Sequence, residues 1–144
     1  MATEAWQTLS YEDVSVGAEL PVLDIPITVT AIVSGALASR DYQDVHHDRE
    51  LAIERGSPDI FMNILTTNGY VGRYITDWAG PNSLLRSVDI RLGAPNYPGD
   101  EMQLSGRVTA KQDGVVTVEL VGANQLGNHV TGIVEVQLPM GAAG

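Results

Sequence analysis

The sequence predicts an α+β fold, in which a curved antiparallel sheet wraps around one long central helix. Over residues 60–78 apolar side chains recur at helical intervals, so this stretch is predicted to form the longest helix. After Pro81, apolar and polar residues alternate in successive stretches separated by turn residues, which is typical of half-buried antiparallel strands. One early strand, a helical insertion, the long helix and a meander of about four strands complete this plan.

Local signals place three elements in the first half of the chain. β-branched residues alternate after a proline within 20–30, which predicts the early strand. Thr30 is the expected N-cap of a short helix over 31–39, because a threonine hydroxyl can accept from a free N–H of the first turn. Asp48 is the expected N-cap of a second short helix over 49–55 for the same reason.

The long predicted helix has an apolar stripe and two internal glycines. Ile64, Val71 and Ile75 fall on one face, and we expect this stripe to lie in the core. Gly69 and Gly72 each cost about 1 kcal/mol relative to alanine inside a helix. We therefore expect another element to cross close to the face that carries them.

The length of the chain fits a single domain that spans residues 1–144. Residues 1–19 are expected to form a surface arm whose Trp6 and Leu9 pack down onto the body of the protein. Residues 139–144 are expected to form a flexible tail, because they are small and lack a periodic pattern.

Composition excludes several classes of protein. The 44% hydrophobic and 18% charged residues are typical of a globular chain, and the apolar runs are too short to span a membrane. The net charge of −10 argues against a nucleic-acid partner. The N-terminus lacks the pattern of a signal peptide and the chain has no cysteine, so we expect a cytoplasmic location.

A polar cluster at 41–48 is the candidate for chemistry, because polar groups between core segments are costly unless they are hydrogen-bonded. Three interpretations stay open. The cluster can be a capping loop in which Asp48 caps a helix and the histidines are exposed. It can be a metal site formed by His46, His47 and Asp48, although adjacent side chains point apart. It can also hold an acid–base pair, Asp41 and His46, around one water molecule.

Two segments carry a resemblance to a known family. The segment 41–48 is similar to the hydratase motif of MaoC-like, (R)-specific enoyl-CoA hydratases, in which an Asp is followed five residues later by a His. The segment 91–100 resembles the strand-and-loop signature of that family, with its Arg, Pro and Gly-Asp. The two segments flank the predicted long helix in the family's order. The resemblance implies a hotdog fold, in which a sheet wraps the central helix, and an assembly of two or more subunits.

Three stretches, 39–48, 59–65 and 76–81, resemble one branch of the family, the small MaoC-like subunits of actinobacterial steroid side-chain enoyl-CoA hydratases. The branch implies a catalytic subunit that works with a larger MaoC-like partner in a heterodimer or heterotetramer. It also implies a substrate that is a CoA thioester of a steroid with a shortened, unsaturated side chain. No cofactor and no metal are expected, since CoA is part of the substrate.

The resemblance also implies roles for individual residues. We expect Asp41 to activate the water that adds to the double bond, and His46 to orient this water and shuttle its proton. Gln43 is expected to hold the Asp41 carboxylate. Sequence alone does not divide the acid and base roles within the pair.

One departure from the family concerns the thioester oxygen. Phe61 and Met62 stand where most members have His-Gly, whose glycine N–H holds this oxygen. Because a backbone N–H survives a change of side chain, Met62 is the expected oxyanion donor at the start of the long helix. Arg91 is a candidate for contact with a CoA phosphate, and a surface role for Arg91 fits the sequence equally well.

Two other functions compete with hydration. A non-catalytic hotdog subunit would complete a partner's acyl-CoA tunnel, but it would have no need of both Asp41 and His46. A hotdog thioesterase usually carries its carboxylate on the central helix, where this chain has only Asp77 near the far end. His129 lies at the start of a predicted strand, and the sequence shows no partner for it.

Overall fold

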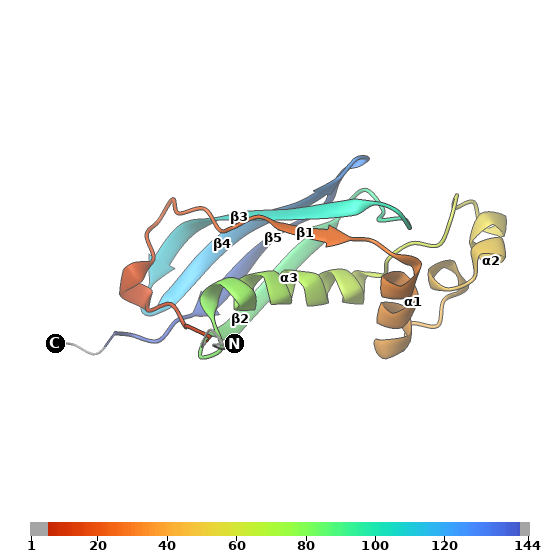
Figure 1. The fold of residues 1–144 in the computed structure, drawn as a ribbon. Helices are drawn as coiled ribbons and strands as arrows, with labels where there is room; N and C mark the ends of the chain where they lie inside the picture. Colours follow the sequence, from red (N-terminus) through yellow and green to blue (C-terminus); the bar gives the residue numbers. More distant parts are fainter. Residues whose placement is uncertain (1–5, 142–144) are drawn as a thin grey trace, which may run out of the picture.

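A computed structural model describes residues 6–141, so the parts of the predicted arm and tail at 1–5 and 142–144 lie outside the described residues. The chain forms one five-stranded antiparallel sheet with the strand order β1-β3-β4-β5-β2 and one long helix, α3 (Figure 1). The elements, in order, are η1 (Tyr11–Asp13), β1 (Leu23–Pro26), α1 (Val29–Ala38), η2 (Asp44–His46), α2 (Arg49–Glu54), α3 (Ile64–Ala79), β2 (Leu84–Leu92), β3 (Glu101–Gln112), β4 (Val115–Asn124) and β5 (Gly127–Gln137).

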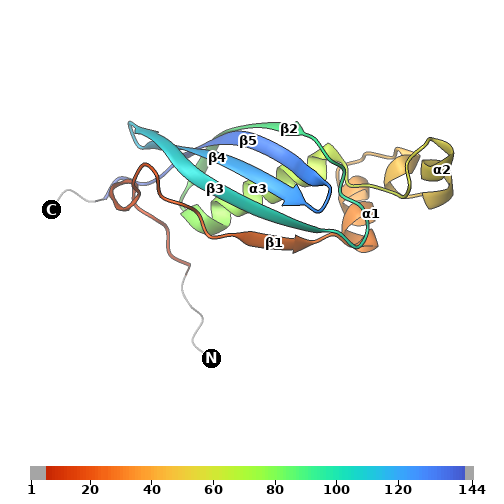
Figure 2. The same ribbon diagram turned by 90° about the horizontal axis from the view of Figure 1, so that it is seen from above.

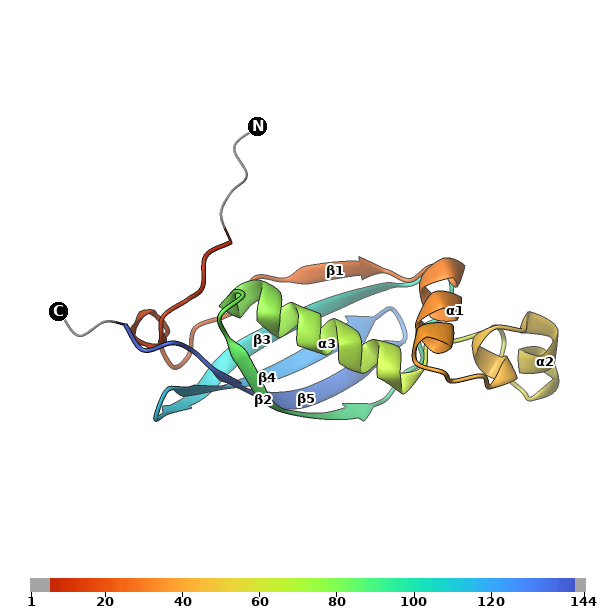
Figure 3. The same ribbon diagram turned by 90° about the horizontal axis from the view of Figure 1, so that it is seen from below.

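Helix α3 lies across one face of the sheet, and α1 and α2 lie beyond the sheet at the end where α3 begins (Figure 3). Viewed from the opposite side, the other face of the sheet carries no helix formed by the described residues 6–141 (Figure 2). The prediction of an α+β fold built from one antiparallel sheet and one long helix is confirmed.

The core fills the space between α3 and the inner face of the sheet. The predicted stripe is buried at Val71 and Ile75, whereas Ile64 in the first turn is 46% exposed. Each fully buried aliphatic side chain of this kind stabilises the fold by about 1.5–3 kcal/mol. The strands supply alternate residues to the same core: Met102, Leu104, Val108, Val116, Val118, Leu120, Val130, Val134 and Val136.

The helices begin at different residues from those predicted. Thr28, not Thr30, caps α1, since its Oγ1 accepts from the Ala31 N–H at 3.0 Å. Helix α3 begins at Ile64 instead of residue 60 and is capped by Asn63. Before it, the Phe61 N–H donates to Val45 O and the Met62 N–H to Asn96 O, each at 3.1 Å. The prediction that Asp48 caps α2 is confirmed, because its Oδ1 accepts from a first-turn N–H at 3.1 Å.

The prediction that an element crosses close to Gly69 and Gly72 is wrong. A Cβ built on Gly69 would meet no atom within 4 Å, and one on Gly72 would make only an ordinary contact at 3.7 Å. The close crossing is made by Gly35 of α1, whose Cβ would lie 2.2 Å from Thr66 Oγ1 on α3. The glycine that permits the approach is therefore on the shorter helix.

The described part of the N-terminal arm is bound to the body of the protein. Leu9 packs partly against the core, as predicted, but Trp6 is 78% exposed, so the expectation that it packs down is wrong. Lys111 Nζ donates to the carbonyl of Tyr11, and the Tyr11 N–H in turn donates to Pro139 O at 3.0 Å. The start of the predicted tail is thus bound to the arm.

Across residues 6–141, no helix combines the length and the apolar character that crossing a membrane requires.

Candidate active site

The end of helix α1 places Asp41. Ser39 ends the helix, and Arg40 adopts a left-handed conformation with φ of 57°, which is uncommon for a residue other than glycine. The Asp41 N–H then donates to Ala36 O at 2.9 Å, which closes the turn. This turn directs the Asp41 side chain toward the start of α3. Backbone strain of this kind costs about 1–3 kcal/mol and is typical of functional sites.

His46 lies at the end of η2 and is only 6% exposed. Its Nδ1 is 2.7 Å from Phe61 O, and because a carbonyl can only accept, Nδ1 carries the hydrogen. The rings of Phe61 and His46 also pack edge to face, with 4.9 Å between their centroids. In neutral His46, Nε2 therefore presents a lone pair.

That lone pair faces Asp41. The distance from Nε2 of His46 to Oδ2 of Asp41 is 3.4 Å, longer than an ordinary hydrogen bond. Neutral His46 and ionised Asp41 both accept hydrogen bonds there, so a water molecule that donates one hydrogen to each would satisfy both groups. Such a water would keep its oxygen lone pairs free to attack an electrophile.

Asn63 holds the Asp41 carboxylate. Its Nδ2 donates to Asp41 Oδ2 at 3.1 Å and to Ser39 Oγ at 2.9 Å. Its Oδ1 accepts from the backbone N–H and the hydroxyl of Thr66, at 2.9 and 2.6 Å. The residue that caps α3 is therefore also the residue that orients Asp41.

These contacts lower the pKa of Asp41 below its ordinary value of 3.8. The largest cause is the hydrogen bond from Asn63, which stabilises the ionised form. Burial opposes this effect, and the Gln43 N–H and the charge of His46 make smaller contributions in the same direction as Asn63. The carboxylate is thus held ionised at neutral pH.

Two predicted site residues do not take the expected positions. The Gln43 side chain is exposed, and only its backbone N–H approaches Asp41, at 3.4 Å from Oδ1. Met62 is buried, and its N–H donates to Asn96 O at 3.1 Å, so it is not a free oxyanion donor. The Met62 difference goes with the start of α3 at Ile64, after the residues that the prediction assigned to its first turn.

The free N–H groups lie slightly further along the chain. Within residues 6–141, the N–H groups of Asn63, Ile64 and Leu65 donate to no acceptor. They lie at the positive end of the α3 dipole, which favours a negative charge. Asn63 was not among the predicted site residues, although an Asn directly before an apolar helical stripe is a known N-cap signal.

His129 joins a loop to the first turns of α3. It is 1% exposed, with Nδ1 at 2.7 Å from Ala94 O and Nε2 at 2.8 Å from Thr67 Oγ1. Burial lowers the pKa of His129 from 6.5. Since Nδ1 donates to the carbonyl, the Thr67 hydroxyl donates to Nε2. His129 thus has two partners that the sequence did not reveal.

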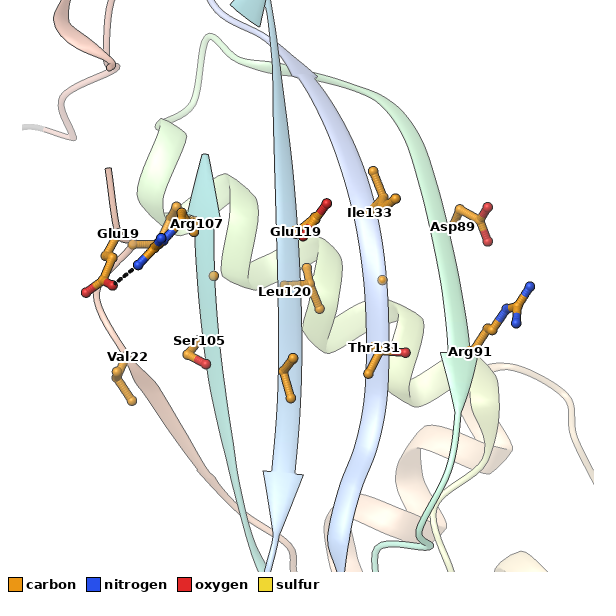
Figure 4. Close-up of a pocket in the computed structure, with 14 residues that line it drawn as sticks. Glu19, Val22, Asp89, Arg91, Ser105, Arg107, Glu119, Leu120, Thr131 and Ile133 are labelled. Carbon is orange, nitrogen blue, oxygen red and sulfur yellow. Dashed lines mark hydrogen bonds and ion pairs between the residues drawn. The ribbon is translucent and has the colours of Figure 1, made fainter. Parts of the chain in front are cut away.

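Arg91 lies on the outer face of the sheet, away from the pair. It lines a trough of about 770 Å³ that also includes the ion pair between Glu19 and Arg107 (Figure 4). Asp41 and His46 do not line this trough. Within this chain, Arg91 and the acid–base pair are therefore not brought together.

The residues suggested for a metal site are used in other ways. Asp48 caps α2, His46 faces Asp41, and His47 is exposed. In the part of the chain that the structure describes, no group of three or more His, Cys, Asp or Glu residues is arranged to hold a metal ion.

Comparison with known proteins adds independent information. The family model "MaoC like domain" matches residues 14–129. A protein of Mycobacterium tuberculosis, the beta subunit of 3-oxo-4,17-pregnadiene-20-carboxyl-CoA hydratase, is 56% identical over 123 residues, which cover 85% of this chain and 95% of that protein.

Solved structures agree with this match. A chain in the crystal structure of the ChsH1-ChsH2 complex from M. tuberculosis is 56% identical, with a TM-score of 0.84 over 86% of this chain and 98% of that one. The R-hydratase PhaJ1 of Pseudomonas aeruginosa has a TM-score of 0.86 at 20% identity, over 93% of this chain and 88% of that one. The second likeness concerns the fold alone, and it confirms the expected hotdog fold.

Proposed function

Because the chain belongs to the family of MaoC-like domains, we propose that it is the catalytic subunit of an enoyl-CoA hydratase. This enzyme adds water across the 2,3-double bond of an acyl-CoA thioester. The observation that carries the proposal is the 3.4 Å approach of Asp41 Oδ2 to His46 Nε2, two acceptors that face one point beside the start of α3.

The proposed reaction uses each group in turn. Asp41 takes a proton from the bound water while the water oxygen forms a bond to C3 of the substrate. The charge that develops on the thioester oxygen is stabilised by the free N–H groups of Asn63, Ile64 and Leu65. The proton passes from Asp41 to His46 Nε2 and from there to C2. Both groups end the cycle as they began, so the reaction needs no cofactor.

The substrate and partner follow from the similar proteins. We assign to this chain a steroid CoA thioester with a shortened, unsaturated side chain, as formed in steroid or cholesterol degradation, because the relative that is 56% identical acts on a pregnadiene carboxyl-CoA. The partner is a larger MaoC-like subunit in a heterodimer or heterotetramer. Such a partner would also supply basic groups for the CoA phosphates, since this chain has a net charge of −10. Arg91 stays a candidate for one of these contacts.

We also propose that the enzyme works in the cytoplasm, where CoA thioesters are made, and that it binds no nucleic acid. The absence of cysteine is compatible with this compartment. A thioesterase is disfavoured, because the only carboxylate on α3, Asp77, is 3.1 Å from Arg73 in an exposed ion pair.

The test is to co-express the chain with candidate MaoC-like partners and to measure hydration of steroidal and straight-chain enoyl-CoA thioesters. Asp41→Asn and His46→Ala should each lower hydration by at least about 100-fold, the scale of one positioned acid–base group. His47→Ala is the matched control, because His47 is the exposed neighbour of His46 and should keep full activity. Full activity in either folded variant of the pair would refute the assignment.

A further inference from the structure

We propose that Asn63 is a positioning residue for Asp41, and that through Asn63 the first turn of α3 determines where the carboxylate points. The effect on turnover rests on the proposed hydratase function, whereas the effect on the carboxylate itself does not.

The hydrogen bonds of Asn63 leave it one orientation. A side-chain amide has two donor hydrogens and a carbonyl that accepts two bonds. Both donors are used by Ser39 Oγ and Asp41 Oδ2, and the carbonyl accepts both bonds from Thr66. Ser39 Oγ donates to Gly35 O at 2.7 Å, so it must accept from Asn63. A rotated amide would place its oxygen against the Asp41 carboxylate and its NH2 against the Thr66 N–H, so it would lose both of these bonds.

Asn63 contacts the Asp41 carboxylate oxygen that faces His46. Its Nδ2 lies 3.1 Å from Asp41 Oδ2, and this is the oxygen that faces His46 Nε2. The other oxygen, Oδ1, has a weaker contact with the backbone N–H of Gln43 at 3.4 Å. The orientation of Asp41 toward His46 therefore depends on Asn63 rather than on its own loop.

Burial makes this contact stronger than its length alone suggests. Asn63 is 2% exposed, whereas the Asp41 side chain is 20% exposed. The Asn63 amide thus contacts the Asp41 carboxylate from the protein interior. The solvent-facing side of the carboxylate stays accessible to water and substrate. A hydrogen bond to a charged acceptor in such surroundings is stronger than one in water.

The substitution Asn63→Ser separates the two roles of the residue. A serine hydroxyl at this position can accept from the Thr66 N–H, as serine is among the best N-caps, but it has no amide to offer Asp41. Asn63→Ala removes both roles and is the matched comparison. The melting temperature should therefore fall clearly in Asn63→Ala and only slightly in Asn63→Ser.

In the complex with the partner subunit, Asn63→Ser should lower kcat by about 10- to 100-fold, the scale for a misplaced catalytic group, and leave KM within about twofold. The acid limb of the kcat/KM profile should move to higher pH, because the pKa of Asp41 rises when the amide is lost. His46 is the titratable group in residues 6–141 that lies within ion-pair distance of Asp41, so the carboxyl titration described next is also recorded in His46→Gln, alone and together with Asn63→Ser. A wild-type kcat and pH profile in folded Asn63→Ser would overturn the proposal.

A second measurement does not depend on activity. The ¹³C signal of the Asp41 carboxyl, assigned by comparison with Asp41→Asn, is titrated in the full-length wild-type chain and in Asn63→Ser. We expect the wild-type pKa to lie below 3.8 and to rise in the variant. An ordinary wild-type pKa would contradict the inference even if no variant folds. If the proposed function itself is wrong, the wild-type complex will show no hydratase activity, whatever the pKa of Asp41.

Discussion

Replacing Gly35 by alanine tests the closest approach between two helices of the site. The added Cβ would lie 2.2 Å from Oγ1, 2.9 Å from Cγ2 and 3.1 Å from Cβ of Thr66. Real atoms do not approach so closely, so either the Thr66 side chain must rotate or α1 must move away from α3. Since the Asp41 N–H is bonded to Ala36 O at the end of α1, and Thr66 holds the amide of Asn63, either response disturbs the site.

The magnitude follows from the contacts that would be lost. Rotation of Thr66 breaks its 2.6 Å hydrogen bond to Asn63 Oδ1, which costs about 1 kcal/mol of stability. Overpacking at the crossing costs about 1–3 kcal/mol more. Alanine regains about 1 kcal/mol over glycine in a helix. We therefore expect Gly35→Ala to lower the free energy of unfolding by about 1–3 kcal/mol.

Gly69→Ala is the matched control, because it makes the same chemical change on α3 where the added Cβ meets no atom within 4 Å. It should raise the free energy of unfolding by about 0.4–1 kcal/mol. The assay is equilibrium unfolding in urea, with the change read from the midpoint at a constant m-value. If both variants shift the midpoint in the same direction by similar amounts, the close crossing at Gly35 does not exist.

Two further predictions concern buried polar groups. Burial lowers the pKa of His129 below 6.5, so the unfolded chain binds this proton more readily; the corresponding stability is full above pH 6.5 and is lost as the pH falls toward the folded-state pKa. Melting temperatures between pH 8 and 5 should fall less steeply in His129→Gln than in the wild type, and parallel curves would contradict this. The Tyr74 hydroxyl is buried without a hydrogen-bond partner in the described structure, and burial raises its pKa to about 12. Tyr74→Phe should therefore match or exceed the wild-type stability in the urea assay, and a loss above about 1 kcal/mol would reveal a partner.

The features that the sequence determined by itself are short-range. Helical spacing predicted the buried face at Val71 and Ile75, two-residue alternation predicted the strands after Pro81, and Asp48 was identified correctly as a cap. The five-residue spacing of Asp41 and His46 was enough to nominate both. Each of these signals depends on residues that are close in the sequence. Over such short separations the repeating geometry of a helix or a strand fixes which side chains share a face.

The tertiary structure decided which groups meet across the site. Asn63 reaches Asp41 over 22 positions and His129 reaches Thr67 over 62, and such contacts depend on how α1, α3 and the sheet cross. Likewise, the Met62 N–H donates to Asn96 O, 34 positions away in the sequence, and α3 begins only at Ile64. An N–H that looks free in the sequence can be satisfied by a distant carbonyl, because hydrogen bonds follow proximity in space.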